Sequence, residues 1–107
     1  MTVYAELLRQ AAADRHDAAQ AAPTASLAAA VLAAHARLGT SPRAVDRLSD
    51  QLAYDLALVE ACHRLGIAEG LSSGEVTEQE RARVRAELAR AWPGLDVGTS
   101  AVEGSPA

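Results

Sequence analysis

The amino-acid sequence predicts an all-α fold, either a small four-helix bundle or a kinked variant with three to four helices. About a quarter of the 107 residues are alanine, which is the strongest helix former and a poor strand residue. Phenylalanine is absent, so leucine, valine and alanine must supply most of the core. No segment shows the alternation of apolar and polar residues that marks a half-buried strand. Four apolar segments, separated by proline and glycine, indicate the four helices.

The first predicted helix covers residues 2–22. Tyr4, Leu7 and Leu8 begin an apolar stripe that continues mainly as alanine. Pro23 ends or kinks this helix, because proline lacks an amide hydrogen and clashes with the preceding turn. A kinked helix pair and a helical hairpin are both compatible with this single proline.

The second and third predicted helices are joined by a short connection. The second carries its apolar face from Leu27 onward and stops at Gly39. The pair Ser41-Pro42 predicts the start of the third helix, since a serine N-cap accepts an amide hydrogen bond and proline suits the first helical position. The third helix then continues to a stop at Gly66.

The fourth predicted helix starts at Thr77, whose spacing to Glu80 is that of a capping box. It ends at Pro93-Gly94. The preceding linker, residues 66–76, is rich in glycine and serine, and we expect an ordered loop or short turn there.

Composition indicates one soluble domain over residues 1–95 and a disordered tail over residues 96–107, which have little to bury. The lone Cys62 excludes an internal disulfide framework and fits a reducing compartment. The first residues lack the basic and apolar regions of a signal peptide. Residues 18–36 carry no formal charge, but they are too polar and too rich in alanine to span a bilayer. We therefore expect a cytoplasmic protein with no membrane partner.

The net charge of −4 argues against a nucleic-acid partner, because contacts to phosphate supply much of that affinity. The arginines between residues 81 and 90 alternate with glutamates, which is typical of a mixed, solvated helix face. We expect no nucleic-acid binding and no cofactor.

Asp55 stands on the flank of an apolar helix face with no basic residue three or four positions away. A carboxylate at the edge of a core needs a partner, or its pKa must rise. We expect an arginine or tyrosine of another helix to hold it; Arg9, Arg15, an arginine of the fourth helix and Tyr4 are available.

Cys62, His63 and His35 are the other residues in this region that could carry chemistry. Adjacent helical residues point about 100° apart, so Cys62 and His63 do not form a thiolate–base pair naturally. Both histidines lie in the last turn of a predicted helix, where a cation stabilises the helix dipole. No histidine pair has the spacing of a zinc helix, and we assign no metal ligand and no catalytic residue. A small-molecule, metal or redox site between helices, using Asp55, Cys62 and His63 or His35, is the alternative function.

The third predicted helix carries two apolar rows. The first, which includes Leu48, Leu52, Leu56 and Val59, is predicted to face the core. The second is predicted to be a subunit or partner interface, because a helix that is apolar on most of its circumference must be surrounded. Its members are Tyr54, Ala57, Leu58, Ala61 and Leu65. The sequence thus favours a non-enzymatic interaction or regulatory module that binds itself, as a homodimer, or another protein.

Overall fold

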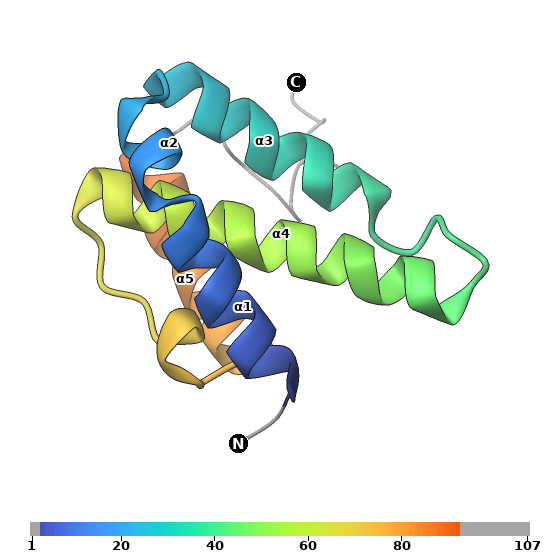
Figure 1. Ribbon diagram of the computed structural model, residues 1–107. Coiled ribbons are helices and arrows are strands. Elements are labelled where there is room, and N and C mark those ends of the chain that lie inside the picture. Colours follow the sequence, from blue (N-terminus) through green and yellow to red (C-terminus); the bar gives the residue numbers. More distant parts are fainter. Residues whose placement is uncertain (1–2, 93–107) are drawn as a thin grey trace, which may run out of the picture.

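The computed structural model describes residues 3–92 and confirms the all-α fold: this part of the chain contains five α-helices, one short 3-10 helix and no strand (Figure 1). The first predicted helix occurs as two helices, which raises the count from four to five. The elements are α1 (Val3–Asp14), α2 (His16–Ala21), α3 (Thr24–Arg37), α4 (Ala44–Leu65), η1 (Leu71–Ser73) and α5 (Glu78–Ala91).

Helix α4 is the central element, and every other element contacts it. Figure 1 shows α3 running antiparallel to α4, with α1 crossing α4 on one side and α5 on the other. The core gathers around the C-terminal half of α4. Its largest fully buried side chains include Leu8 of α1, Val31 of α3, Leu58 of α4, Leu71 of η1 and Leu88 of α5.

The first predicted helix is interrupted at Arg15, which the sequence did not predict. Arg15 leaves helical geometry, with φ −100° and ψ 3°. Its guanidinium Nε lies 2.7 Å from a carboxylate oxygen of Glu60 on α4. Pro23 stands between α2 and α3, so the prediction that it ends a helix is confirmed. The ion pair with Glu60 holds the bend between α1 and α2 against α4.

The predicted start of the third helix at Ser41-Pro42 is wrong. Helix α4 begins at Ala44, after an Arg43 N-cap that makes no side-chain capping bond. The Ser41 hydroxyl instead donates to Asp50 at 2.8 Å. Tertiary contacts thus replace the local cap.

The predicted stops at Gly39 and Gly66 are confirmed, and both glycines have positive φ. Thr77 caps α5 as predicted, since its hydroxyl oxygen accepts from the Glu80 amide at 3.1 Å. The reciprocal half of the capping box does not form, because the Glu80 carboxylate accepts from the Gly70 amide instead, at 2.8 Å. The linker is an ordered loop, as predicted, and Leu71 fixes it in the core.

Two sequence predictions concern the ends of the chain and its relation to membranes. The tail predicted over residues 96–107 and the helix stop predicted at Pro93-Gly94 lie outside the described residues. None of the helices between residues 3 and 92 is both long and apolar enough to cross a bilayer.

Candidate functional site

The apolar row predicted to form an interface lies in the core of the protein's own chain. Tyr54, Ala57, Leu58 and Ala61 are buried, and Leu65 is partly buried. Helices α1, α2 and α5 and the loop around η1 all converge on this half of α4. The row is therefore no free surface for a partner, and the predicted interface residues are corrected to core residues.

Tyr54 is the largest of these buried side chains, and its ring packs against the ring of His35 with centroids 5.5 Å apart. Burial raises the pKa of the Tyr54 phenol, and the nearby Arg85 guanidinium opposes that rise. Within residues 3–92, the Tyr54 hydroxyl has no hydrogen-bond partner of good geometry. The ring contact with Tyr54 gives His35 a packing role at the edge of the core.

Asp55 is fully buried and bound by groups from two other helices, as predicted. Arg81 of α5 donates to both carboxylate oxygens, from Nε at 2.8 Å and from Nη2 at 2.9 Å. The Tyr4 hydroxyl of α1 donates at 2.5 Å, and the Gln51 amide at 3.2 Å. Each carboxylate oxygen thus accepts two hydrogen bonds, which fills its lone pairs. Asp55 ties α1, α4 and α5 together and has no acceptor position left for a ligand.

The electrostatics of this cluster keep both of the principal donors to Asp55 in their donating forms. Burial, together with the hydrogen bond to Asp55, raises the pKa of Tyr4 above its ordinary value. The hydrogen bond to Asp55 also raises the pKa of Arg81. Tyr4 therefore stays a neutral donor and Arg81 stays a cation, which is the combination that a buried carboxylate requires.

Cys62, His63 and His35 occupy separate environments, and the structure does not bring them together with Asp55. Cys62 is buried in the core, where burial raises the pKa of its thiol to about 12. His63 lies 2.9 Å from a carboxylate oxygen of Glu69 in the loop that follows α4. Across residues 3–92, no group of three or more His, Cys, Asp or Glu side chains could hold a metal ion. The four residues of the predicted ligand site therefore do not line a common site.

Two polar residues of α4 have roles that the sequence analysis missed. Glu60 binds Arg15, as described above, although its side chain is almost completely buried. Arg64, one turn later, donates through Nη2 to the backbone carbonyls of Ala19 at 2.9 Å, Gln20 at 2.6 Å and Ala22. Arg64 therefore caps the end of α2 and not the end of its own helix. Arg15 and Glu60 are 45 residues apart along the chain, so their spacing in the sequence gives no signal for this ion pair.

Two of the exposed apolar residues lie on the other half of α4. Val45 and Leu48 are 59% and 53% exposed, and Leu52 and Leu56 are partly buried. These four residues recur every three or four positions and so share one helix face; we refer to them as the α4 stripe. Leu48 was predicted to face the core, and its exposure corrects that prediction. Val59, the last member of the same predicted row, is fully buried as predicted, so the row passes from the surface at Leu48 into the core at Val59.

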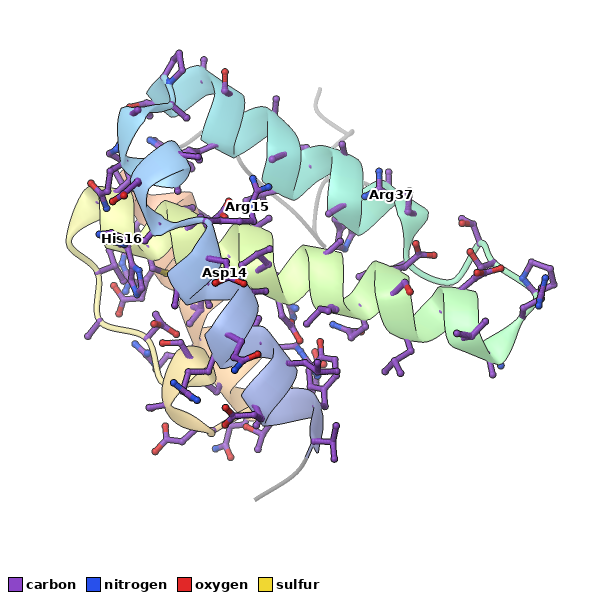
Figure 2. The ribbon with its side chains drawn as sticks, viewed as in Figure 1. Asp14, Arg15, His16 and Arg37 are labelled. Atoms are coloured by element: carbon purple, nitrogen blue, oxygen red, sulfur yellow. The ribbon has the colours of Figure 1, made fainter. Side chains whose placement is uncertain are left out.

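An open cleft of about 330 Å³ adjoins the α4 stripe between α3 and α4. Figure 2 shows Arg15 at the α1–α2 junction and Arg37 near the end of α3, on either side of this region. Both arginine side chains are more than half exposed. The apolar lining consists of Ala30, Ala33, Ala34, Ala53, Leu56 and Ala57. Leu56 belongs to both features, so the cleft and the α4 stripe form one continuous surface.

Comparison with models of known protein families, with curated proteins and with solved structures gave no match.

Proposed function

We propose that this protein is a non-catalytic helical interaction module that self-associates through the α4 stripe. The observation that carries the proposal is the exposure of Val45 and Leu48 on a helix whose other half is buried. An apolar face on a fixed helix needs little reordering when a partner covers it, so the entropic cost of association is low.

The size of the surface supports an interface that extends beyond α4. A stable dimer buries about 800 Å² on each partner, which is more than four side chains can supply. The alanine-lined cleft adds one flank. Small alanine side chains let a second helix approach closely, so a helical partner fits this surface best.

Light scattering over a concentration series tests the proposal. We expect the native chain to be dimeric at micromolar concentration and Leu48→Glu to be monomeric, because a carboxylate in the centre of the interface would lose its water. Leu32→Glu is the matched control, since Leu32 is 44% exposed on α3 and is not part of the α4 stripe. A native chain that stays monomeric at millimolar concentration would refute the proposal, as would equal weakening by both substitutions.

A further inference from the structure

The two ends of the α4 stripe differ in charge. Around Val45 and Leu48, the end of α3 and the first turns of α4 carry three arginines and two aspartates: Arg37, Arg43, Arg47, Asp46 and Asp50. Beyond Leu56, the α1–α2 junction and the adjoining turn of α4 carry three carboxylates and one arginine: Asp14, Asp17, Glu60 and Arg15. The surface therefore runs from a net positive end to a net negative end.

Arg43 and Asp14 are the charges on which the inference depends. Within residues 3–92, neither side chain makes a hydrogen bond or an ion pair. Each also stands at the unfavourable end of a helix. Arg43 is the N-cap of α4, where the helix dipole disfavours a cation, and Asp14 is the last residue of α1, where it disfavours an anion. An opposite charge from a partner would relieve both.

A second copy of the chain can supply those charges. The α4 stripe spans residues 45–56, so its midpoint lies between Leu48 and Leu52. An antiparallel two-fold pairing about that midpoint places Arg43 of one copy opposite position 58 of the other, within one turn of Glu60. Asp14 lies beside that turn, because its neighbour Arg15 is bonded to Glu60. The same contact then occurs twice, as two-fold symmetry requires.

We infer that two copies associate antiparallel through their α4 stripes, with Arg43 of each copy paired with Asp14 of the other. This inference rests on the proposed self-association and specifies its geometry. The charges select the antiparallel arrangement, since a parallel one would bring Arg43 against Arg43.

Charge reversal provides the experiment. Arg43→Glu and Asp14→Arg should each weaken self-association about tenfold at low salt, because two attractive pairs become repulsive. An equimolar mixture of the two variants should recover native affinity as a heterodimer, since both of its contacts are again between opposite charges. The matched control is Arg90→Glu, which reverses a largely exposed arginine on α5 and should leave the affinity unchanged.

The outcomes separate this inference from the proposal on which it rests. A monomeric native chain refutes both. If the native chain dimerises and Leu48→Glu disrupts it, but the charge variants and their mixture behave like the native chain, then self-association stands and the antiparallel arrangement is wrong. Circular dichroism verifies that each variant is folded. A mixture of the neutral variants Arg43→Gln and Asp14→Asn should recover part of the lost affinity, because its heterodimer restores one of the two Arg43–Asp14 pairs; no recovery there would also overturn the pairing.

Discussion

The two halves of α4 have similar apolar content but opposite environments. From Tyr54 to Cys62, every residue except Leu56 is buried, whereas every residue from Ala44 to Ser49 is exposed. Figure 1 shows α1 and α5 crossing the C-terminal half of α4, while the N-terminal half extends alongside α3. The difference comes from the neighbours that dock, because apolar side chains are present in both halves. Apolar periodicity identifies a helix face that can be buried, and docking decides whether it is buried.

Matched substitutions in the two halves should differ most in their effect on folding. Leu58→Glu removes a fully buried leucine and places a carboxylate in the core. We expect it to cost more than about 5 kcal/mol, which is enough to unfold a domain of this size. Leu48→Glu, on the exposed half, should change the free energy of unfolding of the monomer by less than about 0.5 kcal/mol. Urea denaturation followed by circular dichroism, at concentrations below association, measures both. A folded Leu58→Glu variant would contradict the burial of this half.

The carboxylates of the two halves provide the next comparison. Asp55→Ala should lower the free energy of unfolding by about 3 kcal/mol, because it leaves the mostly buried Arg81 without its anion. Asp55→Asn should recover little of that loss, since the principal partner is a charged arginine. Asp50→Ala is the control nearer the exposed half; it removes one hydrogen bond from Ser41 and a long ion pair with the exposed Arg37, and should cost about 1 kcal/mol or less. Equal losses for Asp55→Ala and Asp50→Ala would show that the buried cluster contributes no special stability.

The success of the Asp55 prediction shows what sequence reasoning can establish. A carboxylate on an apolar flank without a local cation must find a partner elsewhere, and this requirement does not depend on how the helices are arranged. The helix stops at Gly39 and Gly66 and the Thr77 cap were predictable for a similar reason, since each depends on local backbone chemistry.

The failed predictions all depended on tertiary contacts. The two halves of α4 are similarly apolar in the sequence, so only the positions of α1 and α5 show which half is covered. Ser41 has the chemistry of an N-cap, but a hydrogen bond to Asp50 replaces that role. The bend at Arg15 depends on Glu60, which is 45 residues away along the chain. The sequence alone does not show which apolar residues stay exposed, because that depends on which helix faces the other helices cover.

The smallest expected effect concerns the loop that covers the buried half of α4, and it depends on pH. Hydrogen bonds from Arg83 and from the Gly70 amide lower the pKa of Glu80 to about 2. A carboxyl group whose pKa is lowered by folding contributes stability above its ordinary pKa of about 4.3, and loses that contribution as the pH falls toward its folded value.

Glu80→Gln should therefore be less stable than the native chain at pH 7. The difference should shrink as the pH falls below about 4 and should be small at the acid end of the range, because the native carboxylate then begins to be protonated as well. Glu78→Gln is the control on the same helix; its carboxylate is 73% exposed, so it should leave the free energy of unfolding nearly unchanged at either pH. Urea denaturation at several pH values between about 2.5 and 7 measures the difference. A stability loss for Glu80→Gln that stays constant over this range would mean that the loop is held by Leu71 and its apolar contacts, and not by the Glu80 carboxylate.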